Sequence, residues 1–134
     1  MSGTETILLL AAQMMARAHA PYSRFHVGAV VRDDQNRLHG GCNVENAAYP
    51  LGSCAEANAI SRMVSEGGHQ IREIWVMARG EQLVTPCGGC RQKIREFAAP
   101  DTPVHLCEPG RIVRTVTLGE LLPMSFGPEV FHHD

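Results

Sequence analysis

The apolar positions of this chain fall into short runs separated by glycine, proline and polar turn residues. The first run predicts a helix, with a possible capping box between Ser2 and Glu5 at its start. Pro21 is expected to stop this helix after Ala20, because proline cannot continue the backbone hydrogen bonding of a helix.

The next runs predict strands and helices in turn. A β-rich segment from Phe25 to Arg32 is followed by the turn residues 33–36, which indicates a hairpin whose second strand runs from Arg37 to Val44. Three later strands are expected at 71–78, 104–107 and 112–117. Three later helices are expected from 53 to about 67, from 87 to 97, and from 117 to the proline at 123. This order predicts an α/β fold in layers.

Length and charge restrict the possible functions. A chain of 134 residues with 44% hydrophobic content predicts one domain with one core. The formal net charge is -2, and lysines and arginines are scattered without interleaved aromatic residues. A polynucleotide substrate is therefore not expected, and we predict a free, uncharged small molecule.

The N-terminal apolar run resembles a signal peptide, but its flanking charges argue against one. No lysine or arginine precedes residues 8–12, Glu5 does, and Gln13 and Arg17 interrupt the run well short of a membrane span. The five cysteines, an odd number, are typical of a reducing compartment with metal ligands. We therefore expect a cytoplasmic protein without membrane partners.

Two short segments carry the chemistry: Cys54-Ala55-Glu56 and Pro86-Cys87-Gly88-Gly89-Cys90. Zinc is four-coordinate and binds thiolates well, so three cysteines leave one position for water, as in catalytic zinc sites. A C-x-x-C pair alone also fits a redox dithiol, half of a structural zinc site or an iron–sulfur fragment. A structural zinc site would need a fourth protein ligand, and a redox pair would not need Cys54.

The predicted helix starts bring these groups together. Cys54 opens one helix, and Cys87 and Cys90 open another, so two helix N-termini would direct partial positive charge at the thiolates. Glu56, two residues after the first ligand, could reach the water in the open position and transfer its proton.

The two segments together match the signature of zinc-dependent base deaminases, with Cys54 where other members have histidine. The chain resembles the small homotetrameric cytidine deaminases over nearly its whole length. The other matching segments are 20–25, 41–47, 121–123 and 126–128. The resemblance implies a layered α/β/α fold with a mixed five-stranded sheet, formed by a single domain over residues 1–134. It also implies zinc as cofactor and hydrolytic deamination of cytidine and 2'-deoxycytidine in pyrimidine salvage.

By the same resemblance, Asn43 and Glu45 would hydrogen-bond the sugar hydroxyls, and Phe25 would line the pocket. Without the family, these residues would be interpreted as a turn residue, a surface charge and a core side chain. The complete motif favours the functional interpretation for all three.

Four more roles follow from the resemblance alone. The backbone at Ala55 and Thr85 would contact the edge of the cytosine ring. Phe126 would reach the base from a neighbouring subunit of a homotetramer, and Tyr49 would lie near that interface.

One position departs from the family. An arginine usually follows Cys-Ala-Glu and offsets the charge of the thiolates, whereas this chain has Ala57. Arg91, adjacent to Cys90, is the nearest candidate to compensate. The departure leaves open a same-fold deaminase of another aminated heterocycle, such as a modified cytidine or a nucleoside antibiotic.

The remaining cysteines and the strand histidines are not expected to bind the metal. Cys42 and Cys107 are predicted to be small buried apolar side chains. His26, His39 and His105 lie in strand-like runs and are not preferred zinc ligands.

Overall fold

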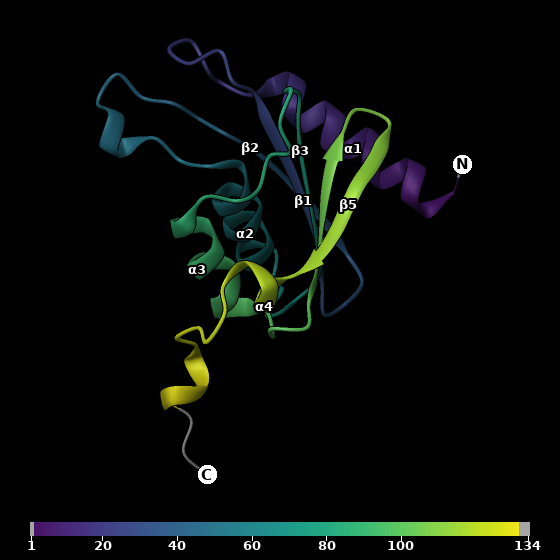
Figure 1. The fold of residues 1–134 in the computed structure, drawn as a ribbon, viewed down its shortest axis with the longest axis vertical. Helices are drawn as coiled ribbons and strands as arrows, with labels where there is room; N and C mark the ends of the chain where they lie inside the picture. The colour runs from purple at the N-terminus through teal and green to yellow at the C-terminus, as the bar shows by residue number, and fades with distance from the viewer. Residues whose placement is uncertain (1, 132–134) are drawn as a thin grey trace.

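The computed structural model describes residues 2–131 and has a five-stranded sheet between helices (Figure 1). The strands are β1 (Val27–Asp33), β2 (Leu38–Cys42), β3 (Ile71–Ala78), β4 (Pro103–Glu108) and β5 (Arg111–Thr117). The helices are α1 (Gly3–Arg17), α2 (Ala55–Ser65), α3 (Gly88–Phe97) and α4 (Leu118–Leu121), with short 3-10 helices η1 (Tyr49–Leu51) and η2 (Pro128–Phe131).

The sheet is mixed, as predicted. Its strand order is β2-β1-β3-β4-β5, in which β3 and β4 are parallel and the other neighbouring pairs are antiparallel. The parallel pair is joined by a crossover that contains α3, because parallel neighbours cannot be connected by a tight turn.

The alternation of side chains along the strands separates two apolar layers. Ala29 and Val31 belong to the core beneath α2 and α3, whereas Val30 packs with Trp75 and Met77 against α1. Both faces of the central strands are therefore covered by helices, with α1 on one side and α2 and α3 on the other (Figure 1). The predicted α/β/α layering is confirmed.

Side-chain caps define two helix starts. The Ser2 hydroxyl accepts the backbone N–H of Glu5 at 3.1 Å, which satisfies a free donor at the start of α1. Thr117 and Glu120 form a complete capping box at α4, as the sequence predicts.

The prediction that the first helix continues to Ala20 is wrong, because α1 ends at Arg17. The next residues leave the helix to pair with a distant segment: His19 forms a parallel bridge with Val44. A long-range hydrogen-bonded partner therefore ends the helix before the proline does.

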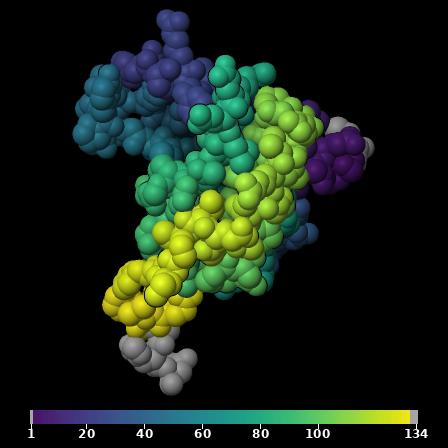
Figure 2. Space-filling view, viewed as in Figure 1, coloured from purple at the N-terminus to yellow at the C-terminus, as the bar shows by residue number. Residues whose placement is uncertain are grey.

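Two segments project from the layers towards opposite ends of the long axis (Figures 1 and 2). One is the arm of residues 43–54, which carries η1 and whose ends are joined by an antiparallel bridge between Val44 and Ser53. The other is the C-terminal tail of residues 123–131, which carries η2. No helix in the described part of the chain combines the length and apolar character needed to cross a bilayer.

The start of α2 lies unusually close to β2. A Cβ placed on Gly41 would lie 2.3 Å from the backbone nitrogen of Ala59 and 2.7 Å from the carbonyl oxygen of Ala55. Only a residue without a side chain permits this contact, so Gly41 fixes the distance between β2 and the helix that begins beside Cys54.

Gly41→Ala is expected to lower the free energy of unfolding by about 1–3 kcal/mol, because the backbone of α2 would have to move away from the sheet. Urea denaturation of the zinc-loaded protein measures the change. Gly3→Ala is the matched control, since a Cβ there meets nothing within 4 Å. Equal stability of the two variants would contradict this account of the β2–α2 contact.

Candidate active site

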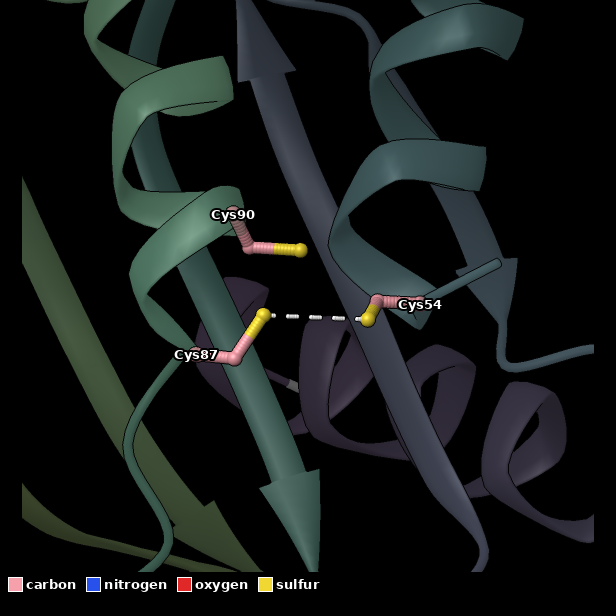
Figure 3. Close-up of side chains that lie close together, drawn as sticks. All are labelled: Cys54, Cys87 and Cys90. Carbon is pink, nitrogen blue, oxygen red and sulfur yellow. Dashed lines mark hydrogen bonds between the residues drawn. The ribbon is translucent and has the colours of Figure 1, made fainter. Parts of the chain in front are cut away.

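Three cysteine side chains converge between the starts of α2 and α3 (Figure 3). Cys54 is the N-cap of α2, Cys87 is the N-cap of α3, and Cys90 lies in the first turn of α3. Their Sγ atoms all lie within 4.8 Å of one another, and those of Cys54 and Cys87 are 3.8 Å apart. The predicted cluster is therefore present, on the predicted helix starts.

The geometry of the sulfurs fits zinc. Two thiolates bound to one tetrahedral zinc at about 2.3 Å would be roughly 3.8 Å apart, whereas a disulfide would need about 2.05 Å. Among the described residues, no histidine or carboxylate completes the group as a fourth ligand. The cluster therefore has three protein ligands, which is the arrangement of a catalytic zinc site.

Three thiolates so close together would repel one another unless a cation lay between them. Burial raises the pKa of Cys54 and that of Cys90. At Cys54 the Cys87 sulfur adds to the rise in pKa, although a hydrogen bond with the Cys90 thiol opposes it. At Cys90 the charge of Glu56 and the two other sulfurs add to the rise. Burial also disfavours the Cys87 thiolate, but the nearby Cys90 N–H and the other two thiols lower its pKa overall. Three thiolates cannot share this space without a positive ion, so metal binding is expected to release protons.

Glu56 follows in the first turn of α2, and this residue is only 4% exposed. Burial raises the pKa of this carboxyl, because the charged form loses its water. Glu56, Cys54 and Cys87 line the same cavity of about 310 Å³. This position suits a carboxyl that takes up and returns a proton beside the metal site.

The cavity collects most of the side chains that the resemblance assigns to the substrate. Phe25, Asn43, Glu45, Ala55 and Thr85 all line it. They come from the loop before β1, the arm after β2, the start of α2 and the loop before α3. The structure thus brings together residues separated by 60 positions in the sequence.

Asn43 and Glu45 also hold the chain around the cavity. The side-chain amide of Asn43 accepts a hydrogen bond from the N–H of Val27 and donates one to the carbonyl of Phe25, both at 2.8 Å. These two bonds take the place of a neighbouring strand, so β1 begins only at Val27. The Glu45 carboxylate accepts hydrogen bonds from the hydroxyl and from the backbone N–H of Ser23. Both bonds lower the pKa of Glu45, because they stabilise its charged form. Direct contacts with a sugar stay a prediction.

The two aromatic residues expected at a subunit interface lie in different places. Tyr49 lines the cavity from the arm. Phe126 is on the C-terminal tail, is 59% exposed, and does not line the cavity of its own chain.

Arg91 holds the loop before α3 in place through hydrogen bonds. Its guanidinium donates to the carbonyls of Pro86 and Leu121 at 2.8 Å and to the Thr85 hydroxyl at 3.0 Å. These bonds tie the cavity wall at Thr85 to the end of α4. Compensation by Arg91 for the charge of the thiolates stays a prediction.

Several lining residues were missed by the sequence analysis. They are mainly apolar or small and come from four segments: Val27, Val44, Tyr49, Gly52, Ser53, Val76 and Val84. Tyr49 was expected only at an interface. Val44 lies between the predicted site residues Asn43 and Glu45, and Ser53 lies beside Cys54, but no local signal identifies the others. Asn58 was also missed: its amide donates to the carbonyl of Cys42 and to Ser53, and so fixes the start of α2 on β2.

The residues excluded as ligands have other surroundings. His39 lies between two carboxylates: its Nε2 atom is 2.8 Å from an oxygen of Asp33, and its Nδ1 atom is 2.8 Å from an oxygen of Glu66. His105 stacks on Trp75. Cys107 is buried as predicted, but the prediction of a buried Cys42 is wrong, because this thiol at the end of β2 is only partly covered.

Residues 1–106 match the family described as the cytidine and deoxycytidylate deaminase zinc-binding region. The chain belongs to this family. It is 39% identical over 123 residues to a cytidine deaminase of Sporosarcina psychrophila, covering 90% of each chain. It is 40% identical over 119 residues to a cytidine deaminase of Halalkalibacterium halodurans, covering 89% of this chain and 90% of that one.

Solved structures agree in fold. The crystal structure of cytidine deaminase from Burkholderia pseudomallei superposes with a TM-score of 0.85 at 34% identity, over 94% of this chain and all of that one. Cytidine deaminase from Mycobacterium tuberculosis gives a TM-score of 0.80 at 35% identity, over 95% and 99% of the two chains. The layered fold and the zinc-binding segments of this chain are therefore those of its family.

Proposed function

We propose that this protein hydrolyses cytidine and 2'-deoxycytidine to uridine and 2'-deoxyuridine with release of ammonia. The observation that carries the proposal is the cavity in which a three-cysteine zinc site adjoins a buried carboxyl, Glu56. The similarity to proteins named cytidine deaminase over about nine-tenths of the chain supports the choice of substrate.

Cys54, Cys87 and Cys90 would hold the zinc. When bound, zinc keeps a fourth position for water and lowers the pKa of that water towards neutrality. Glu56 takes up the proton given up by the attacking water, as a general base. The same carboxyl donates this proton to the ring nitrogen beside C4. It then takes up the second proton of the added water from the new hydroxyl group on C4 and donates it to the amino group, which leaves as ammonia. Water and cytidine thus give uridine and ammonia.

The other cavity residues orient the nucleoside. Phe25 provides an apolar wall, and the backbone at Ala55 and Thr85 contacts the polar edge of the ring. Asn43 and Glu45 each retain acceptor capacity beyond their present bonds, which suits the sugar hydroxyls. Selective loss of affinity for the nucleoside on Asn43→Ala would support this placement.

The active species is a homotetramer in which Phe126 completes the cavity of a neighbouring subunit. The exposure of Phe126 and its absence from the cavity of its own chain support this arrangement. Sedimentation is expected to give about four times the 14.6 kDa of one chain, and Phe126→Ala is expected to raise KM. A fully active monomer would contradict the shared pocket.

A second candidate function is deamination of a modified cytidine or another aminated heterocycle by the same fold. The observation in its favour is Ala57, which stands where the family usually has an arginine. A substrate panel separates the two: cytidine, 2'-deoxycytidine, 5-substituted cytidines, adenosine and free cytosine, each followed by ammonia release. A higher kcat/KM for a modified nucleoside than for cytidine would favour the second candidate. Pyrimidine salvage and a cytoplasmic location stay predictions.

A further inference from the structure

The C-terminal tail is attached to α3 through a buried arginine (Figure 2 shows the tail in yellow beside α3 in green). The Arg95 side chain is 8% exposed, and its guanidinium forms a two-bond pair with the Glu129 carboxylate at 3.0 and 2.9 Å. It also donates to the Ser125 hydroxyl at 2.9 Å and to the carbonyl of Ala98 at 3.2 Å. One side chain of α3 therefore holds both ends of the segment 125–129.

The backbone between these ends is fixed as well. A Cβ on Gly127 would lie 2.5 Å from the Cζ atom of Arg95, so the tail passes directly over the guanidinium. Gln92, one helical turn before Arg95, donates to the carbonyl of Phe126 at 2.8 Å. Phe126 nevertheless remains mostly exposed. Its ring meets that of Phe131 edge-on, with 5.9 Å between the ring centroids.

A planar guanidinium paired with a carboxylate through two bonds fixes orientation as well as position. Such a set of bonds around one exposed aromatic residue reduces the entropy that the ring would lose on contact with a ligand. The arrangement is that of a preorganised side chain on a supported backbone, as binding sites require.

We infer that Arg95, with Glu129 and Gln92, is a positioning residue for the reaction of the neighbouring subunit, because it holds Phe126 in the orientation in which that ring covers the neighbour's nucleoside. This inference rests on the proposed function and its shared pocket. The alternative is a clamp that only attaches the tail to its own subunit.

We call the bonds from Arg95 and Gln92 to the tail, with Glu129 as the ion-pair partner, the clamp. Two variants weaken this clamp and keep a positive charge at position 95. Glu129→Gln removes the partner's charge at a residue whose side chain is 63% exposed, and Arg95→Lys removes the planar two-bond geometry. Each is expected to raise KM for cytidine by about tenfold and to change kcat by less than about twofold, because the ring contributes equally to ground-state and transition-state binding. Glu108→Gln, which breaks the exposed pair with Arg111, is the matched control with KM within about twofold of wild type.

Mixed assemblies test whether the clamp acts across the interface. Arg95→Lys subunits, which keep Glu56, are co-expressed with Glu56→Gln subunits, which keep an intact tail, and purified through two different tags. A fraction of the turnover is expected to recover the wild-type KM, since an intact neighbour supplies Phe126 to a pocket with Glu56. If Arg95→Lys does not fold, Glu129→Gln takes its place in the same mixture.

The outcomes separate this inference from the proposed function. No cytidine turnover by wild type would contradict the proposed function. An active wild type with unchanged KM in both clamp variants, or mixed assemblies that show only the raised KM, would overturn the role of Arg95 and leave the proposed function intact.

Discussion

Glu56→Gln is expected to lower kcat for cytidine by at least about 100-fold, the low end for removal of a positioned acid/base group. The amide has the size of the carboxyl but cannot take up the proton of the attacking water. Because Glu56 is buried and is not one of the sulfur ligands, the variant should keep its fold and one zinc per chain.

The measurement is steady-state kinetics together with metal analysis. Glu96→Gln, at an exposed carboxylate of α3, is the control and should retain wild-type kcat. Turnover within about tenfold of wild type by a zinc-loaded Glu56→Gln protein would remove Glu56 from its proposed role.

Cys87→Ala is expected to lose the zinc and to lower kcat/KM by at least about 1,000-fold. Metal-assisted chemistry provides several kcal/mol, and each tenfold in rate corresponds to about 1.4 kcal/mol. The variant is also expected to melt at a lower temperature, because metal binding to the native state joins the starts of α2 and α3. Cys87 suits this test because its side chain is exposed, so alanine leaves no cavity in the core.

Cys42→Ala is the matched control, since this thiol lies outside the cluster. It should keep stoichiometric zinc and near-normal turnover. Full zinc content in Cys87→Ala would show that another residue completes the site, as a structural zinc site would require.

The sequence predicts the metal centre well because its determinants are local. The spacing of Cys87 and Cys90 places both in one helical turn, and Cys54 and Glu56 lie together at the start of another helix. Once the layered fold brings these helix starts together, the sulfurs converge with little further adjustment.

Contacts between distant segments are the ones that the sequence does not reveal. The early end of α1 depends on pairing of His19 with Val44, 25 positions later. The attachment of the tail depends on Arg95 and Glu129, 34 positions apart. In the printed sequence these appear as ordinary surface residues, and only the folded chain makes them partners.

The sequence also does not identify the valines in the walls of the cavity. Val76 faces the cavity from the middle of the sheet, and Val84 does so from the loop before α3. A valine in a strand or loop carries no local mark that distinguishes a pocket wall from a core position, because both are apolar.

The most direct test of the proposed activity is to incubate the zinc-loaded wild-type protein with cytidine and to quantify uridine and ammonia in the same samples. The account predicts one ammonia for each uridine formed, the same ratio with 2'-deoxycytidine, and product formation at least about 100-fold slower with Glu56→Gln at equal protein concentration. Zinc-loaded, correctly folded wild-type protein that forms no uridine from cytidine would contradict it.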